Sequence, residues 1–190
     1  MTTIIDQTGG FAANAPLLSQ GAVAGHIREA IGRGRRRILV LGPARSRRLA
    51  AVRQALGAPG YRLVVVDLAS VRSRKDLDRA VLRATRSRDF YAGMGKLEWL
   101  AQRRPMAVVF HNLDACSGRP CESAIVYRIW SQLSNHTRTP LAVFTVRDVE
   151  FADRCNKSFP SFAEHVRRVT FFPNHAAGAA IGPTLFRRAV

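Results

Sequence analysis

The chain has 190 residues, 47% of them hydrophobic, which is long and apolar enough for one well-buried domain. Its formal net charge is +17 at pH 7, and nearly all of the positive charge is arginine, because only three residues are lysine. This charge indicates an anionic partner, nucleic acid before a membrane surface, although an arginine excess also has a plainer origin in genome base composition.

The cysteines and the hydropathy pattern exclude several other classes of protein. Cys116, Cys121 and Cys155 are odd in number and lack close paired spacing, which argues against a disulfide scaffold and favours a reducing compartment. Together with His111 they match no standard zinc-binding spacing, so we expect no metal site. Neither a signal peptide nor a membrane-length apolar run is visible. We therefore expect a cytoplasmic protein without a membrane segment.

The N-terminal segment, residues 1–18, has a glycine pair, an asparagine and a proline but no hydrophobic period, which predicts a flexible arm. Ser19 is placed to cap a helix that runs to Ile31. We expect the folded domain to cover residues 19–175 and the weakly patterned residues 176–190 to form a C-terminal tail.

The stretch after the first predicted helix has the pattern of a phosphate-binding unit. Residues 38–41 form a short apolar run typical of a buried parallel strand, and Gly42 opens a turn. Residues 49–56 then carry apolar side chains at helical spacing. A strand, a glycine-led loop and a helix form the setting in which helix N-termini bind phosphate groups. The alternative is an ordinary strand-to-helix turn with a basic helix start.

The loop departs from the phosphate-loop pattern G-x-x-x-x-G-K-[ST] in most of its defined positions. Gly42 supplies the first glycine, but Arg47 stands at the second, where a side chain hinders close approach of the backbone to phosphates. Arg48 replaces the lysine, exchanging a compact point charge for a larger planar group. Leu49 replaces the hydroxyl residue and has no oxygen to bind Mg²⁺.

The remaining apolar runs alternate with helical patterns. Strands are predicted at 62–68, 106–110, 141–146 and 168–172. Helices are predicted from Ser73, over 96–104 and from Ser123, and a short helix with a loop over 149–159. Residues 90–95, with two aromatic residues and two glycines, are predicted as a loop. This alternation predicts an α/β fold, a three-layer αβα sandwich with a mostly parallel sheet of about five strands.

Arginines gather at two places in this pattern, at the entry to the first strand and along the helix that begins after Ser73. A basic helix face is usually just solvated, but these side chains are also suited to bidentate contact with nucleic-acid phosphates. The candidate nucleic-acid contacts are Arg33, Arg35, Arg36, Arg37, Arg72, Arg74, Arg79, Arg83 and Arg86.

The order of these elements resembles the core of AAA+ and STAND-type P-loop ATPases over residues 21–173. RRRILVLGPARS looks like the entry to their phosphate loop, VVFHNLDA like their second ATPase motif, and VFTVRD like their sensor strand. FADRCNKSFPSFAEHVRRVTFFP is similar to the segment before the last core strand in the AAA+ helpers of DNA transposition and in origin-recognition-type ATPases. The resemblance implies a P-loop NTPase fold for this domain.

Within this resemblance, the metal-side aspartate of the second motif corresponds to His111 and the water-activating glutamate to Asn112. Mg²⁺ prefers oxygen ligands to a neutral imidazole, and an amide is not a base. Thr145 keeps the polar character of the sensor position, and the chain ends soon after the fifth strand, so we expect no lid domain. The expected remnants of a nucleotide pocket are Gly42, Arg47, Arg48, Leu49, His111, Asn112 and Thr145.

Phosphoryl transfer depends on charge neutralisation by Lys and Mg²⁺ together with a positioned nucleophile, and here all of these positions are replaced together. We therefore expect a catalytically inactive AAA+-like domain that acts as a DNA-associated scaffold or regulator and assembles with itself or with an active AAA+ partner. No catalytic residue and no cofactor is assigned, although arginines at a helix N-terminus leave ATP binding open. The alternatives are a variant P-loop ATPase in which Arg48 replaces the lysine, and an interaction module for an acidic protein.

Overall fold

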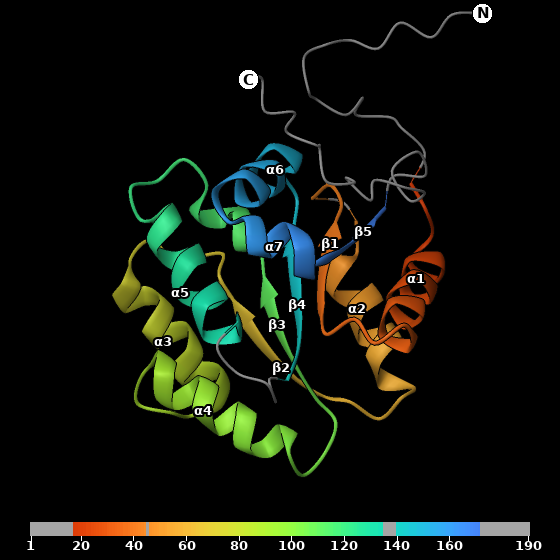
Figure 1. The fold of residues 1–190 in the computed structure, drawn as a ribbon, viewed down its shortest axis with the longest axis horizontal. Helices are drawn as coiled ribbons and strands as arrows, with labels where there is room; N and C mark the ends of the chain where they lie inside the picture. The colour runs from red at the N-terminus through yellow and green to blue at the C-terminus, as the bar shows by residue number, and fades with distance from the viewer. Residues whose placement is uncertain (1–16, 45, 135–139, 172–190) are drawn as a thin grey trace, which may run out of the picture.

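Five short strands form the centre of the computed structural model, which describes residues 17–44, 46–134 and 140–171 (Figure 1). Each predicted strand is present, because runs of β-branched and aromatic residues favour extended backbone that is buried on both faces. The strands are β1 (Arg37–Leu41), β2 (Arg62–Asp67), β3 (Met106–His111), β4 (Leu141–Val146) and β5 (Arg167–Thr170). The last residue of the fifth predicted strand, residue 172, lies outside the described residues.

All pairings in this sheet are parallel, and the strand order is β2-β3-β4-β1-β5. The prediction of an α/β fold with a parallel five-stranded sheet is therefore confirmed. Parallel strands need crossover connections, which the helices supply. The helices are α1 (Gln20–Gly32), α2 (Arg48–Gly57), α3 (Arg74–Thr85), α4 (Phe90–Ala101), α5 (Glu122–Ser134), α6 (Val149–Ser158), α7 (Pro160–His165) and the short 3₁₀ helix η1 (Leu113–Cys116).

The helices cover both faces of the sheet, and alternate residues of each strand point to opposite faces. Val40 and Val143 pack in the core beneath α1 and α2. Leu39 and Phe144 pack in the core beneath α3, α4, α5 and α6. Figure 1 shows α1 and α2 on the right of the sheet and the other helices on its left and front. The molecule is thus the three-layer sandwich that the sequence predicts.

Residues 90–95 correct one prediction, because they begin α4 and do not form a loop. Asp89 caps this helix, and its side chain accepts a hydrogen bond of 2.9 Å from the amide of Ala92. Gly93 is needed for packing, since a Cβ there would lie 2.4 Å from Cγ1 of Val81 on α3. Gly93, one of the two glycines that suggested a loop, instead permits close contact between α3 and α4.

The predicted arm, residues 1–18, and the predicted tail, residues 176–190, lie outside the described residues except for Leu17 and Leu18. These two leucines pack on the α1–α2 side of the core, and the amide of Leu18 donates to the carbonyl of Phe171 over 2.7 Å. In the described part of the chain, we find no helix with both the length and the hydrophobicity that crossing a bilayer requires.

Candidate functional site

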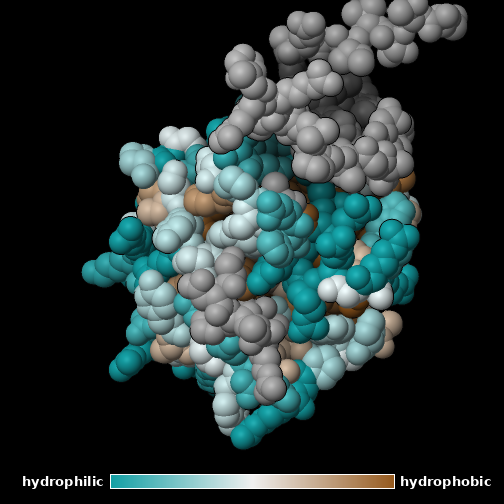
Figure 2. Space-filling view, viewed as in Figure 1, coloured by the Kyte–Doolittle hydropathy of each residue, from teal (hydrophilic) through white to brown (hydrophobic). Residues whose placement is uncertain are grey.

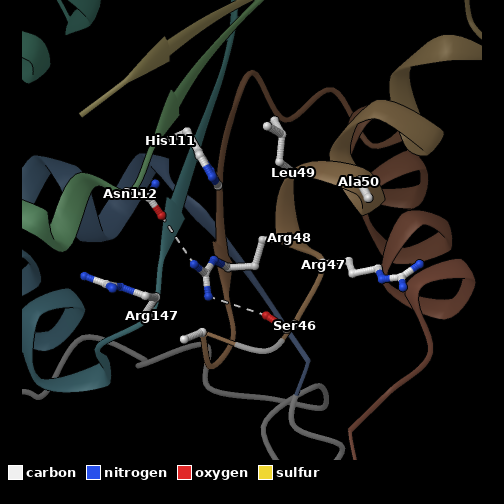
Figure 3. Close-up of a pocket in the computed structure, with 9 residues that line it drawn as sticks. Ser46, Arg47, Arg48, Leu49, Ala50, His111, Asn112 and Arg147 are labelled. Atoms are coloured by element: carbon white, nitrogen blue, oxygen red, sulfur yellow. Dashed lines mark hydrogen bonds between the residues drawn. The ribbon is translucent and has the colours of Figure 1, made fainter. Parts of the chain in front are cut away.

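A pocket of about 400 Å³ opens at the carboxyl edge of the sheet, where β1, β3 and β4 end (Figure 3). Parallel sheets place the residues that follow neighbouring strands at one edge, which is where ligands of such folds bind. The pocket is lined by Ala44, Ser46, Arg47, Arg48, Leu49, Ala50, His111, Asn112 and Arg147. The fold thus brings the predicted loop after β1 together with the predicted positions after β3.

The loop after β1 is a tight turn anchored on the sheet. The amide of Gly42 donates to the carbonyl of Val146 over 3.1 Å, and the amide and hydroxyl of Ser46 both donate to the carbonyl of Pro43. A Cβ at Gly42 would lie 2.6 Å from Oγ of Ser46 and 2.7 Å from a ring carbon of Phe171. The first glycine is therefore required by close packing of the loop itself.

Arg48, at the position of the phosphate-loop lysine, is turned inward and only 4% exposed. Its guanidinium donates to the carbonyl oxygens of Gly42 and Pro43, to the latter over 2.6 Å. A longer contact of 3.4 Å reaches the amide oxygen of Asn112 across the pocket, as Figure 3 shows. The two terminal nitrogens of this guanidinium are thus engaged with the chain's own acceptors.

Burial lowers the pKa of Arg48 from its ordinary value, and the nearby carboxylate of Asp114 opposes that shift. The Arg48 Nε is buried without a hydrogen-bond partner among the described residues. A guanidinium keeps its charge even when desolvated, so Arg48 is a buried cation beneath the loop. The carbonyl dipoles of Gly42 and Pro43 and the carboxylate of Asp114 stabilise this charge from within the chain.

Arg47 and Leu49 flank this arginine and take other directions. Arg47 caps α2 with φ of −84°, so its backbone does not adopt the left-handed conformation that favours glycine. Its exposed side chain points away from the pocket in Figure 3. Leu49 is partly buried and packs against the core beneath α1 and α2. Neither residue supplies an oxygen to the pocket through its side chain.

At the ends of β3 and β4, the predicted positions form a closed hydrogen-bond network. Nδ1 of His111 lies 2.7 Å from the hydroxyl of Thr145, and that hydroxyl also accepts from the amide of Asn112 over 3.1 Å. Burial lowers the pKa of His111, which favours the neutral ring that can accept the threonine proton. Asn112 has φ of +58°, a conformation that asparagine tolerates better than most residues.

The sequence interpretation missed two polar residues that line the pocket, Ser46 and Arg147, and one that lies beside it, Asp67. Asp67, at the end of β2, accepts from the side-chain amide of Asn112 over 3.2 Å. Nε of Arg147, which follows β4, donates to the buried carboxylate of Asp114 over 3.0 Å. Ser46 closes the loop, as described above. The available signal was that polar residues directly follow neighbouring parallel strands, which places Asp67 and Arg147 at the same edge.

The chemistry of the pocket is cationic. Arg48 and Arg147 line it, and it lies at the N-terminus of α2, where the helix dipole also favours an anion. Asp114 is nearly buried and paired with Arg147, so it is not available to activate water. Among the residues that the structure describes, no group of three His, Cys, Asp or Glu side chains is arranged to hold a metal ion.

The predicted nucleic-acid contacts fall into two groups on opposite layers of the molecule. Arg33, Arg35 and Arg36 lie between α1 and β1 and Arg37 begins β1, whereas the other five lie on α3 or within two residues of it. All are exposed except Arg37, which is half-buried. Arg37 donates to the carbonyl of Leu133 and lies over the ring of Trp130 at 5.3 Å. The fold does not join the two groups into one surface.

No family model matches the chain, and no curated protein matches its sequence. Its fold, however, is similar to solved structures. The Walker-type ATPase of Pyrococcus abyssi shares 11% identity, with a TM-score of 0.62 over 84% of this chain and 56% of that one. The Aeropyrum pernix ORC1 protein, solved in complex with DNA, shares 15% identity, with a TM-score of 0.57 over 82% of this chain and 45% of that one.

A third similar structure is the Cdc6 protein of Pyrobaculum aerophilum, with 14% identity and a TM-score of 0.51 over 87% of this chain and 49% of that one. The chain therefore spans about half the length of these structures. At these identities the similarity concerns the fold, which is P-loop NTPase-like and similar to that of AAA+ ATPases of the ORC and Cdc6 type.

Proposed function

We propose that this chain is an AAA+-like domain that does not hydrolyse ATP and that acts as a DNA-associated scaffold or regulator, assembling with itself or with an active AAA+ partner. One observation is the main support for the proposed loss of hydrolysis. The guanidinium of Arg48 occupies the loop and donates to the carbonyls of Gly42 and Pro43, so the group that replaces the phosphate-binding lysine is already bound. The loop is therefore stabilised without a nucleotide.

The other positions of the pocket support the same conclusion. Leu49 is packed into the core and offers no oxygen for Mg²⁺. His111 and Asn112 are both tied to Thr145, and neither replaces a catalytic carboxylate. Phosphoryl transfer needs the charge-neutralising groups together, so replacing all of them removes the basis for catalysis.

DNA association is supported by the charge and by the similar structures. The net charge of +17 is carried largely by arginines on the surface, which suit phosphate contact. One structure of similar fold, ORC1 of Aeropyrum pernix, was solved in complex with DNA. Nucleotide binding without hydrolysis is the second candidate function, because the pocket is open and its cations favour an anion.

Phosphate release from ATP tests the proposed loss of hydrolysis. We expect no turnover above background in the presence of Mg²⁺, with or without duplex DNA. The matched variant is Arg48→Ala, which removes the residue at the position of the lysine. Turnover that is present in the wild-type chain and absent in Arg48→Ala would contradict the proposal. Turnover equal in both proteins would identify a contaminating ATPase.

Two titrations test the remaining parts. Calorimetry with ATP, with and without Mg²⁺, decides whether the pocket still binds nucleotide. Binding to a labelled duplex at several salt concentrations tests DNA association. If about five arginines contact phosphates, log K should fall with log salt at a slope near −4.5. A slope near zero would contradict the DNA part of the proposal and leave the loss of hydrolysis untouched.

A further inference from the structure

A second hollow, of about 250 Å³, lies between α1 and the edge strand β5, and we call it the α1–β5 groove. Arg33 and Arg35 follow α1, and Arg167 and Arg168 begin β5. All four line the groove. The fold therefore gathers arginines from two ends of the described chain. Figure 2 shows hydrophilic side chains on the right of the molecule, over α1 and β5.

The charges in this groove are only partly balanced. Arg33 pairs with Glu29 at 2.6 Å, and Arg168 pairs with Asp153 at 2.6 Å. Arg35 and Arg167 are exposed, and within the described residues neither has an acidic partner. Two guanidinium groups in one hollow are thus left with all of their side-chain donors available.

The rest of the lining favours a small anion over an apolar anchor. The carbon-only side chains in the groove are those of Ala30 and Val169, both short. Protein interfaces obtain most of their affinity from a few large side chains, often aromatic, that are buried in well-packed pockets. The lining of this groove does not form such a pocket. Arginine pairs instead suit the two free oxygens of a phosphodiester, which they bind bidentately.

Two of the arginines near α3 are engaged with the chain. Arg79 pairs with Asp76 at 3.1 Å. The guanidinium of Arg72 donates to the carbonyls of Ala69 and Val71, each over 2.9 Å. Arg74 and Arg83 are exposed on this helix without an acidic partner among the described residues, so they provide a matched control for charge.

We propose that the α1–β5 groove binds the phosphate backbone of duplex DNA, with Arg35 and Arg167 as its principal contacts. This inference rests on the DNA association proposed above and adds which of the two arginine groups carries it. It also assigns a binding role to Arg167, which the fold places in the same groove as Arg35 although the two are distant in sequence. Glu29 holds Arg33 in an ion pair and so limits the charge that the groove presents.

The test compares two double variants of the full chain. Arg35→Ala/Arg167→Ala removes the groove contacts, and Arg74→Ala/Arg83→Ala removes the same charge from α3. Each is titrated with a labelled duplex across a series of salt concentrations, and thermal unfolding checks that both variants are folded. Each lost phosphate contact lowers the salt slope by about 0.9, so the groove variant should lose about 1.8 from the slope. The α3 variant should keep the wild-type slope.

The possible outcomes separate this inference from the function on which it rests. If the wild-type chain binds DNA and the groove variant keeps its slope, or if both variants lose equally, the assignment to the groove is wrong. If the wild-type chain shows no salt-dependent binding, the DNA proposal fails first. A poly-glutamate competitor that binds the wild-type chain more tightly than the duplex, and is lost in the groove variant, would overturn DNA as the ligand. Arg35→Lys/Arg167→Lys should keep the slope, because both charges remain.

Discussion

In the pocket at the carboxyl edge, Arg48 is buried and donates to carbonyls of its own loop, whereas in the α1–β5 groove Arg35 and Arg167 are exposed and unpaired. Both hollows are rich in arginine, but the first holds its central arginine buried beneath the loop, whereas the groove presents two exposed guanidinium groups without an acidic partner among the described residues. A cation attracts an external anion to the extent that its own neighbours have not already satisfied it. The comparison therefore separates arginines that hold the fold from arginines that can bind a partner.

The largest effect that this comparison predicts is on stability. Arg48→Ala should lower the free energy of unfolding by about 1.5–3 kcal/mol, because it removes hydrogen bonds from a charged donor to the carbonyls of Gly42 and Pro43. Arg35→Ala should change it by less than about 0.5 kcal/mol, as expected for an exposed residue. Urea unfolding of both variants measures the difference. Equal stabilities would mean that Arg48 is not tied to the loop.

The next effect concerns the network at the ends of β3 and β4. Thr145→Val keeps the side-chain volume but removes the hydroxyl that accepts from the amide of Asn112 and contacts His111. Thr145 is fully buried, so the loss of a partner for that amide should cost about 1–3 kcal/mol of unfolding free energy.

The matched control for Thr145→Val is Thr85→Val. The Thr85 hydroxyl donates to the carbonyl of Val81 within the same helix, so its loss leaves no amide without a partner. This variant should be destabilised less than Thr145→Val in the same denaturant titration. A larger loss in Thr85→Val would show that the network around His111 contributes little to the stability of the sheet edge.

Much of the fold could be predicted from the sequence, because short β-branched runs between helical patterns have few other arrangements. The strands at 38–41, 106–110 and 141–146 are confirmed with boundaries within one residue. Residues 90–95 were wrongly predicted as a loop, because Gly93 was interpreted as a turn former although its role is to admit Val81. Periodicity describes one element at a time and cannot show a close contact between two helices.

The sequence predicted that the loop after β1 and the positions at the end of β3 would share one site, but it did not predict the contacts within that site. The departures at Arg48 and His111 are visible in the sequence, since they follow from comparison with the phosphate-loop and second-motif patterns. The direction of the Arg48 side chain is not visible in the sequence, because it depends on carbonyls that only the folded loop places within reach. The same applies to Arg37, whose contact with Trp130 joins residues distant in sequence. Arginine clusters in a sequence therefore do not distinguish buried from available charge.

The half-buried histidine, His111, predicts a smaller effect, on the dependence of stability on pH. Burial lowers the pKa of His111 below 6.5, so the unfolded chain binds a proton more readily than the folded one. The free energy of unfolding should therefore fall as pH drops below about 6.5 toward the lower folded pKa, and should be unaffected by this group above pH 7. His111→Gln should lose less stability than the wild-type chain between pH 7 and pH 5.5. Parallel losses would exclude a role for this ring.

A last variant, with a small expected change in stability, sharpens the comparison at the groove. Glu29→Gln removes an exposed ion pair with Arg33, which should alter the free energy of unfolding by less than about 1 kcal/mol. It should nevertheless strengthen DNA binding, because Arg33 then joins Arg35 and Arg167 as an available cation and steepens the salt slope by up to about 0.9. Damage to the fold would weaken DNA binding, so stronger binding by Glu29→Gln could not be explained by misfolding. An unchanged slope in Glu29→Gln would mean that Arg33 does not face the ligand, and the groove would then bind through Arg35 and Arg167 alone.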